Sequence, residues 1–328
     1  MRFLPTEEQR AFTRSLDAML TSADTPAVVR AWGAGSPEPG LALWTRLAEA
    51  GVFALAVPEP YEGVGPLPVE VALAFVELGR HGVPGPVVET TAAAALLAEL
   101  ARRGDDGPAK RLLPGIASGE TVTTLAPPVA AGGRALDADV AALTLVVTGD
   151  ELRIAPGHGP VRASADPARR LARPAPGGRL LASGPAVTAA AEHAVRWAML
   201  ATAAQSVGVG LTLLDRTVAY AKRRTQFGTA IGSFQAVKHR LADTLIGLEF
   251  ARPLLFGAAL TFERADLAAA KVSAGEAAHA AALTALRIHG AVGYTEELDL
   301  SLWLRKARPL RDAWGAPSRC RALVLGAS

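Results

Sequence analysis

The feature that most constrains the fold is a long apolar stripe in the C-terminal half of the chain. Leu200, Val207, Leu211, Leu214 and Val218 follow one another at spacings of 7, 4, 3 and 4 residues. This spacing places all five side chains on one face of an α-helix. The stripe therefore predicts a long helix with a buried face, as in a helical bundle.

Helical patterns occupy both ends of the chain, and strand-like runs separate them. We predict an N-terminal helical domain over residues 1–118, a reduced β middle domain over 119–187 and a C-terminal helical bundle over 188–328. The predicted fold is therefore mainly α with a small β unit. Helices are expected near residues 41–50, 69–80, 90–103, 234–248 and 266–289, with Thr6 and Thr295 as caps of two others.

The middle segment carries the predicted strands. Val122–Ala126 and Leu143–Val147 are short runs rich in Val, Leu and Thr, and Gly149-Asp150 forms a turn into Glu151–Ala155, where apolar residues alternate. Residues 156–188 are dense in Gly and Pro and are expected to form loops. The prolines and glycines of Val57–Gly65 likewise predict a loop.

Composition excludes several classes of protein. Half of the 328 residues are hydrophobic, and the net charge of +3 is scattered, which disfavours disorder and nucleic-acid binding. Cys320 is the one cysteine, so there is no intramolecular disulfide. Residues 1–8 show no signal peptide, and the uncharged run Trp197–Leu214 contains Gln205 and Ser206, so a core helix is favoured over a membrane span. A cytoplasmic protein is expected.

The densest group of chemically useful side chains lies at a break between two long helical patterns. Arg223–Gly228 reads Arg-Arg-Thr-Gln-Phe-Gly, and Phe234 and Gln235 follow shortly after. Arginine can bind a phosphate through two parallel hydrogen bonds, and an aromatic ring can contact a flat ring system. The alternative is a basic helix end, because cations and Gly both favour a helix C-terminus.

Three motifs, in order, resemble those of the acyl-CoA dehydrogenase family. Trp44–Gly51 and Val57–Gly65 are similar to the family's helix and its "vPe-yGG-G" loop. Arg224–Gln235 is similar to "R-x-QFG-x-x-I-x-x-FQ", the most specific match. Lys271 and Arg287–Glu296 are similar to "K…QIHGG-GYT". The resemblance covers nearly the whole chain.

The resemblance implies a helical N-terminal domain, a middle β-barrel and a C-terminal four-helix bundle, with FAD bound at a subunit interface. It implies oxidation of an acyl-CoA thioester: a carboxylate removes the α-proton, the β-hydride passes to the flavin, and an electron-transfer flavoprotein or similar acceptor reoxidises it. By the same resemblance, the residues that contact the FAD bound mainly by a neighbouring subunit are Arg224, Gln226, Phe227, Gln235, His289, Gly290 and Gly293.

The chain departs from the family where the catalytic base should be. Trp314 stands at the usual Glu position, and an indole cannot accept a proton from carbon. Ala198 stands at an alternative base position used by some members. Asp312 and Glu192 lie near these two positions, but Glu192 is expected to pair with Arg196 four residues on. No catalytic residue is therefore assigned to this chain.

Two other family features are reduced. The "TEP-x-AGSD" loop is echoed only by Leu125–Pro128, so a flavin held by this chain's own middle domain is not expected. Arg287 and Ala291 replace the glutamine and the second glycine of "QIHGG". The motif that reaches into a neighbour's site survives, whereas the residues that would operate a site of the chain's own do not.

Three hypotheses follow. In the first, the chain resembles the Glu-less subunit of heteromeric bacterial acyl-CoA dehydrogenases, completes an FAD site and leaves proton abstraction to a Glu-bearing partner in an α₂β₂ assembly. Those enzymes act on steroid side-chain and other bulky acyl-CoAs. In the second, the chain is a self-sufficient homodimeric dehydrogenase with an atypical base. In the third, it is a flavin-free scaffold. The histidines occur singly, so no metal site is predicted.

Overall fold

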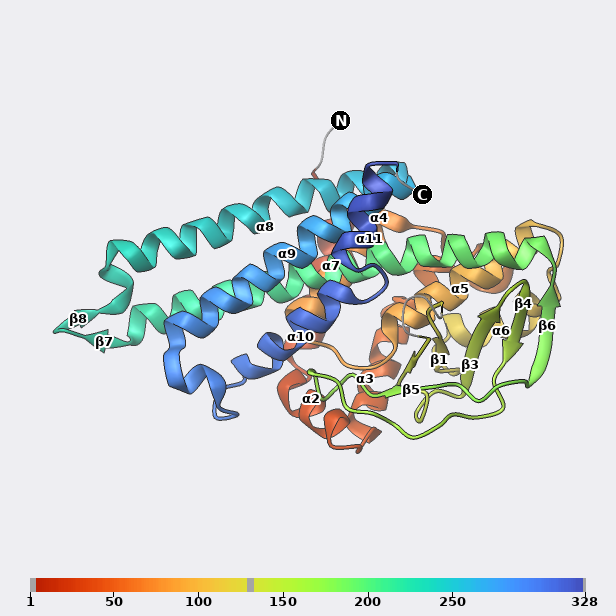
Figure 1. Cartoon of the computed structure of the whole chain (residues 1–328), viewed down its shortest axis with the longest axis horizontal. Coiled ribbons are helices and arrows are strands. Elements are labelled where there is room, and N and C mark those ends of the chain that lie inside the picture. Colours follow the sequence, from red (N-terminus) through yellow and green to blue (C-terminus); the bar gives the residue numbers. More distant parts are fainter. Residues whose placement is uncertain (1–3, 129–132, 327–328) are drawn as a thin grey trace.

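The structure is a computed structural model that describes residues 4–128 and 133–326. Helices come first along the chain, a small sheet follows, and long helices form the rest (Figure 1). This order confirms the predicted mainly α fold with a small β unit. The changes in element type fall close to residues 118 and 187, but the division into three domains remains a prediction. Residues 1–3, part of the segment inspected for a signal peptide, lie outside the described residues.

The N-terminal helices begin where the sequence predicts a cap. The Thr6 hydroxyl accepts a hydrogen bond from the Gln9 amide at 3.2 Å, and the Gln9 side chain accepts one from the Thr6 amide at 2.9 Å. Leu16 and Leu20 of this helix are buried. The helices of this part are α1 (Glu7–Thr21), α2 (Thr25–Gly33), α3 (Glu38–Glu49), η1 (Phe53–Ala56), η2 (Glu59–Tyr61), α4 (Pro68–Arg80), α5 (Val87–Arg102) and α6 (Gly107–Ala117).

A four-stranded sheet forms most of the middle unit, in the order β1-β3-β4-β6. Strand β1 (Thr123–Leu125) is parallel to β3 (Leu143–Thr148), and the other pairs are antiparallel. The predicted turn joins β3 to β4 (Glu151–Ile154), and Gly149 adopts φ 62°, a conformation that glycine tolerates. Strand β6 (Arg179–Ser183) lies in the Gly- and Pro-rich segment of the predicted β unit where loops were expected, and β2 (Ala135–Leu136) pairs with β5 (Leu171–Ala172).

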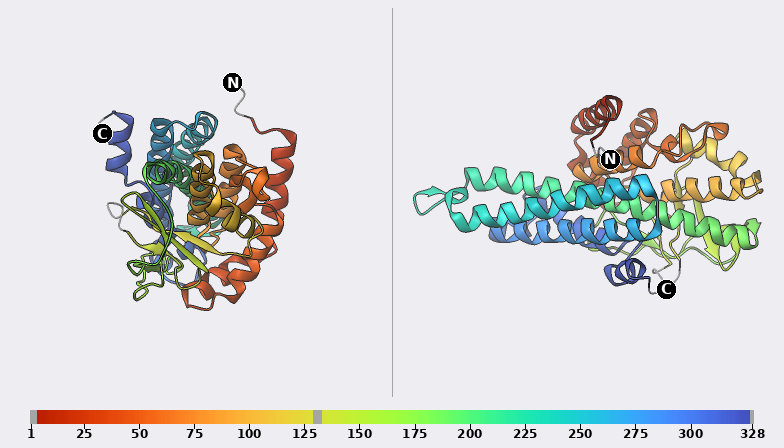
Figure 2. Two further views of the ribbon diagram at one scale, coloured as in Figure 1. Left: turned by 90° about the vertical axis from the view of Figure 1, so that its right-hand side faces the viewer. Right: turned by 90° about the horizontal axis from the view of Figure 1, so that it is seen from above.

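Helix α7 (Pro185–Arg223) is the central element of the structure. It contains the predicted apolar stripe and packs against α4, α5, α8 (Gln235–Thr261) and α9 (Arg264–His289). In the view from above, the green α7, the teal α8 and the blue α9 run alongside one another (Figure 2). Helices α10 (Leu300–Asp312) and α11 (Pro317–Val324) pack against α9.

The connection between α7 and α8 is a small hairpin at one end of the bundle. Strands β7 (Thr225–Gln226) and β8 (Thr229–Ala230) pair antiparallel, and η4 (Ile231–Ser233) leads into α8. Figure 1 shows this hairpin at the far left, at the opposite end of the long axis from the sheet. We call residues 224–235 the tip.

Two sequence predictions differ from the structure. Thr295 does not cap a helix: α10 begins at Leu300 after Asp299, and the Thr295 hydroxyl instead donates to the carbonyl oxygen of Val292 at 3.0 Å. Residues 290–294 continue α9 as a short 3₁₀ turn, η5 (Gly290–Tyr294). The next helix, α10, therefore begins further along the chain than predicted. The predicted loop at 57–65 contains the short 3₁₀ turn η2.

Helix α8 leaves many apolar side chains in contact with solvent. They are Leu245, Ile246, Phe250, Leu254 and Leu260. Helices α7 and α8 are both long and apolar enough to cross a membrane by length and composition, but the apolar window of α7 is 89% buried inside the protein and that of α8 only 28%. The prediction of a core helix for Trp197–Leu214 is therefore confirmed, whereas the absence of a membrane segment remains a prediction.

Glycines allow α4 and α7 to approach closely. A Cβ atom on Gly79 would lie 2.2 Å from the carbonyl oxygen of Gln205, and one on Gly208 would lie 1.9 Å from that of Val76. Real Cβ atoms do not approach backbone oxygens so closely, so any larger residue would push the two helices apart. The contact fixes α7 against the N-terminal helices.

This contact predicts opposite outcomes for two helical glycines. Gly208→Ala should lower the free energy of unfolding by about 1–3 kcal/mol, because the added methyl group overpacks the α4–α7 contact. Gly247→Ala is the matched control: its Cβ would meet only Ala277 Cβ, at 4.0 Å, so alanine should stabilise α8 by up to about 1 kcal/mol. Urea denaturation measures both, and equal effects would contradict the predicted overpacking.

Candidate functional sites

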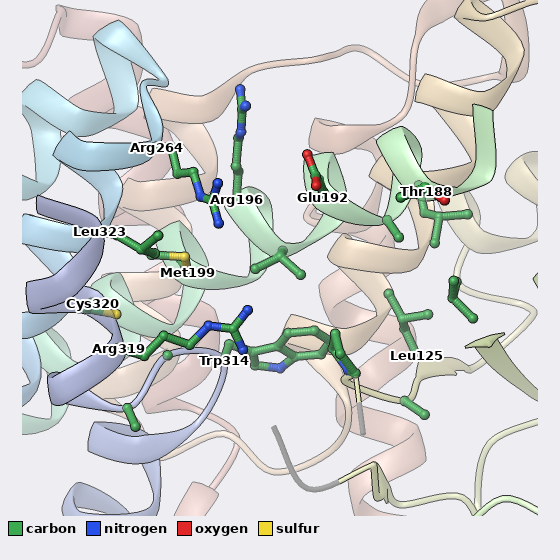
Figure 3. A pocket seen from close by; sticks show the side chains of 18 of the residues that line it. Leu125, Thr188, Glu192, Arg196, Met199, Arg264, Trp314, Arg319, Cys320 and Leu323 are labelled. Carbon is green, nitrogen blue, oxygen red and sulfur yellow. The ribbon is translucent and has the colours of Figure 1, made fainter. Parts of the chain in front are cut away.

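A cavity of about 770 Å³ lies where the sheet meets the bundle. Its apolar lining comes largely from α5, β1, β3, α7 and α11 and includes Leu96, Leu125, Val147, Val195, Met199 and Leu323. Figure 3 shows these elements around Trp314, which lies in the cavity wall. The size and the lining are those of a small-molecule site.

Trp314 occupies the segment between α10 and α11. Its backbone has φ 56°, and its side chain is 7% exposed. The buried ammonium group of Lys271 holds the preceding turn, since it donates to the carbonyl oxygens of Leu310 at 3.0 Å and Arg311 at 2.8 Å. A cation suits these unsatisfied helix-terminal carbonyls, although burial lowers the Lys271 pKa to about 8. Lys271 therefore positions the segment that carries Trp314.

The indole of Trp314 makes a buried hydrogen bond to a carboxyl group. Trp314 Nε1 donates to Glu89 Oε1 at 2.9 Å, while Glu89 Oε2 has no partner among the described residues. Burial raises the Glu89 pKa, and Arg169 and the indole oppose this only in part. Burial therefore disfavours the charged form of Glu89, which is the form that could act as a base. Sequence reasoning missed Glu89, because one acidic residue at the start of an alanine-rich helix carries no distinctive signal.

Charged side chains surround the mouth of the cavity. Arg196, Arg264 and Arg319 line it, and so do Glu192 and Asp312. None of the five forms an ion pair within residues 4–128 and 133–326. The predicted Glu192–Arg196 pair is therefore wrong. Both side chains rise from α7 (Figure 3), but Glu192 is left exposed at the rim.

The predicted cofactor residues of the tip lie far from this cavity. Arg224, Gln226 and Gln235 are exposed, and Phe227 is 93% exposed with φ 53°. The Phe227 ring meets Phe234 edge-on, with ring centroids 6.3 Å apart. The tip thus presents cationic, amide and aromatic side chains to solvent, a set that fits a phosphate joined to a flat ring.

The second predicted group lies at the same end of the bundle as the tip. His289 is buried at the end of α9, where Nδ1 donates to the Ala285 carbonyl oxygen at 2.8 Å. Its ring stacks on Tyr220 of α7 at 4.1 Å, and burial lowers its pKa, which favours the neutral ring. Gly290 has φ 65°. A Cβ on Gly293 would lie 3.1 Å from that of His289. The structure therefore brings His289 and Gly293 together, beside the last turns of α7.

A hollow of about 420 Å³ lies between α8 and α9. His239, Arg240, Asp243 and Arg287 contribute its charged and titratable lining. Arg287 stands at the position of the glutamine in the family motif, so the departure from that motif adds a cation to this hollow.

One group of side chains has the ligand types of a metal site. Single ligand atoms of Asp17, Glu77 and His81 lie within 4.8 Å of one another. His81 Nε2 and Asp17 Oδ1 are already hydrogen-bonded at 2.8 Å, and Arg80 lies 3.6 Å from Glu77 Oε2. Burial raises the Glu77 pKa to about 7. These contacts account for the cluster as an ion network between α1 and α4, and the absence of a metal remains a prediction.

Comparison with known proteins places these features in a family context. Residues 6–120 match the family model described as "Acyl-CoA dehydrogenase, N-terminal domain", and residues 188–322 match "Acyl-CoA dehydrogenase, C-terminal domain". The chain is 32% identical over 306 residues to the acyl-CoA dehydrogenase IpdE2 of Mycobacterium tuberculosis, with 92% of each chain covered. It is 33% identical over 318 residues to IpdE2 of Mycolicibacterium smegmatis, covering 95% of this chain and 96% of that protein.

Two solved structures share the fold over nearly the full length. The Tcur3481-Tcur3483 steroid ACAD superposes with a TM-score of 0.87 at 25% identity, covering 98% of this chain and 97% of that one. The ChsE4-ChsE5 complex from Mycobacterium tuberculosis superposes with a TM-score of 0.83 at 25% identity, and 98% of each chain is covered.

The hydrogen bond between Trp314 and Glu89 predicts the effect of removing its donor. Trp314→Phe leaves a buried oxygen without a partner and should lower the free energy of unfolding by about 1–3 kcal/mol. Chemical denaturation measures this effect. Trp314→Phe combined with Glu89→Leu is the control: with both polar groups gone, the phenylalanine should cost less than it does alone. Equal costs in the two backgrounds would show that the bond contributes nothing.

Burial of Glu89 also predicts a pH dependence. Its pKa is raised above the ordinary value of 4.5, so the folded chain holds a proton that the unfolded chain releases. This contribution to stability is complete below about pH 4.5 and falls as the pH rises through the folded-state pKa. Glu89→Gln should flatten the fall in melting temperature above pH 4.5, as followed by circular dichroism. Parallel curves for the two proteins would mean that the pKa of Glu89 is the same in the folded and the unfolded chain.

Proposed function

Because the chain belongs to the acyl-CoA dehydrogenase family, we propose that it is a flavoprotein subunit whose tip completes an FAD site centred on a partner chain, while the partner supplies the base. The assembly would dehydrogenate the α,β-bond of an acyl-CoA thioester. The observation that carries the proposal is Trp314 in place of a base, combined with an intact, exposed tip at the end of α7, the helix whose N-terminal half lines the Trp314 cavity.

The distance between the two sites supports a role for the tip in another subunit. Met199 lines the cavity, and α7 continues from it to Arg223 before the tip begins. Twenty-four residues of α-helix, at 1.5 Å each, span about 36 Å. One flavin cannot contact the tip of this chain and lie in the Trp314 cavity of the same chain, so the tip serves a site on another subunit.

The residues of the tip fit the cofactor of the family. Arg224 would bind the pyrophosphate, Gln226 and Gln235 would donate to it or to the adenosine, and Phe227 would cover an aromatic face. Gly228 has open space where a Cβ would lie, so its backbone can come close to the phosphates. Bound flavin would accept the hydride; the chain's own residues would hold and orient it.

The Trp314 cavity supports the absence of proton abstraction by this chain. An indole has no lone pair that could accept a proton, and burial raises the pKa of the Glu89 carboxyl group behind it, which disfavours the charged form that a base requires. Ala198, at the alternative base position, is fully buried in α7. Trp314 instead fills the base position with an apolar ring.

The exposed face of α8 supports a partner of related fold. Its exposed apolar side chains lie on the helix that begins at the tip, and exposed apolar surfaces of this kind mark interfaces. The structures of ChsE4-ChsE5 and Tcur3481-Tcur3483 are complexes of two different chains. We propose a heteromer by analogy, with a bulky or steroid-derived acyl-CoA as substrate, since one of these neighbours is named a steroid ACAD. An electron-transfer flavoprotein as acceptor rests on the family resemblance alone.

A second candidate is a homodimer with an atypical base. The observation that favours it is that Glu192 and Asp312 both line the Trp314 cavity. Either carboxylate could accept a proton if the substrate came within hydrogen-bond reach. Both side chains are exposed, however, and this weakens a carboxylate as a base towards a carbon acid. Under this alternative, the chain alone would reduce a dye in the presence of acyl-CoA, and Glu192→Gln or Asp312→Asn would abolish the activity.

The visible spectrum tests the proposed function. The chain purified alone should show little visible absorption from bound flavin, because its tip holds only part of a site. Co-expression with a Glu-bearing homologue should restore both flavin and acyl-CoA-dependent dye reduction. A lone chain that is fully yellow and active would overturn the proposal in favour of the homodimer.

Substitution of Arg224 tests the role of the tip. Arg224→Ala should lower the flavin content of the co-purified complex, because about 1.5–3 kcal/mol of charge-assisted hydrogen bonding is lost, equivalent to roughly 10–100-fold in affinity. Arg223→Ala is the adjacent control, since the Arg223 side chain donates to its own helix at Ala219. If Arg224→Ala changes neither the flavin content nor the activity of the complex, the chain would be a flavin-free scaffold.

A further inference from the structure

We propose that Asp17, Glu77 and His81 bind a divalent transition-metal ion with the ligand preference of zinc, and that the ion joins α1 to α4. Single ligand atoms of the three residues lie within 4.8 Å of one another. Carboxylates and imidazole are both ligands that zinc accepts, and water can fill a remaining position. None of the three residues lines the Trp314 cavity or belongs to the tip, so the inference does not rest on the proposed function.

The end of α4 places two of the ligands side by side. Glu77 lies in the last turn of α4, and His81 is the C-cap of this helix. The His81 amide donates to the Glu77 carbonyl oxygen at 3.0 Å, so the helical spacing of four residues is kept and the two side chains are neighbours. The C-terminal end of a helix carries a partial negative charge, which favours a cation there.

The third ligand comes from α1, which is held beside α4. Nearer the start of both helices, Gln9 Nε2 donates to Glu70 Oε1 at 2.9 Å. Further along, Asp17 Oδ1 lies 2.8 Å from His81 Nε2. Tetrahedral ligands at zinc distances lie roughly 3.3 Å apart, so the ion would widen this pair by about half an ångström. The proton that the pair shares would pass to solvent, because a ligating imidazole nitrogen must be free of it.

The ion network between α1 and α4 leaves one buried oxygen unsatisfied. Glu77 is 8% exposed, and its Oε2 has no hydrogen-bond partner among the described residues. Arg80 Nε lies 3.6 Å from this oxygen, which is too far for a hydrogen bond. The Arg80 guanidinium also donates to Asp215 Oδ2 at 3.3 Å, so it keeps a carboxylate partner if it leaves Glu77. A buried carboxylate without a partner is costly, and a metal ion would remove that cost.

Charge and access both suit a divalent cation. Three carboxylates, those of Asp17, Glu77 and Asp215, share this network with the one guanidinium of Arg80. When the carboxylates are ionised and His81 is neutral, two negative charges are left to balance. The Asp17 side chain is 51% exposed and that of His81 16%, so an ion can enter from solvent.

The inference replaces the sequence-based prediction that the chain has no metal site. That prediction treated each histidine singly. Glu77 and His81 are neighbours on one helix, but Asp17 lies 64 residues before His81, and only the packing of α1 against α4 joins the two.

Isothermal titration calorimetry with zinc chloride tests the site. The full chain, freed of any affinity tag and dialysed against a chelator, should bind one zinc ion per chain. Asp17→Asn, Glu77→Gln and His81→Gln each remove one ligand and should weaken this binding about tenfold or more, because loss of even an outer partner of a metal site costs that much. His158→Gln, at an exposed histidine outside the cluster, is the matched control and should bind as the unmodified chain does.

Two results of the titration would overturn the proposal. One is the absence of saturable zinc binding. The other is binding that none of the three ligand variants weakens, because the ion would then lie elsewhere. Circular dichroism melting without zinc shows which variants are folded, and zinc should raise the melting temperature of the unmodified chain and of His158→Gln more than that of the ligand variants.

Hydrogen exchange tests the link between the helices in the unmodified chain, where no substitution can disturb the fold. Zinc should slow amide exchange in α1, because the ion fixes this helix to α4 and makes its local opening rarer. The same addition to His81→Gln is the control and should leave α1 unchanged. Zinc that binds the unmodified chain without slowing exchange in α1 would overturn the proposed link.

Discussion

The contact between α4 and α7 fixes the position of everything else. Gly79 and Gly208 lack side chains, so the backbones of the two helices come into direct contact. This contact holds the middle of α7 rigidly. A helix held in this way transmits position to both of its ends. Its N-terminal half forms one wall of the Trp314 cavity, and its last turn begins the tip. The two candidate sites are therefore set at a fixed separation by a single element.

A buried polar pair then determines what the cavity can do. In a bare apolar cavity, Trp314 could adopt several orientations, but the bond to Glu89 selects one of them. Lys271 restricts the same segment from the other side by binding the end of α10. One oxygen of the Glu89 carboxyl group is thereby occupied by the indole. Glu89 and Lys271 together therefore fix the indole of Trp314 in the cavity wall.

The fold was largely predictable from the sequence, and the cavity was not. The stripe from Leu200 to Val218 has helical spacing over five turns, and this regular pattern is enough to predict a helix with a buried face. Helices α2 and α6 and strand β6 were not predicted individually. The two helices begin with Thr-Pro and Gly-Pro, which also signal turns, and the strand lies among glycines and prolines. The tip could be proposed because its side chains are adjacent in sequence. Glu89 and Trp314 are 225 residues apart, and only tertiary packing joins them.

The exposed apolar face of α8 has a consequence for the amount of this protein that a cell can maintain. Phe250 is 71% exposed, and Phe227 at the tip even more so. In copies of the chain that have no partner, this surface would be exposed to solvent. Exposed apolar surfaces associate with one another or with chaperones and proteases. If a partner chain covers this face, as we propose, synthesis of the two chains in equal amounts would keep it covered. The level of the protein would then be set by the scarcer of the two chains, whatever the folding stability of either.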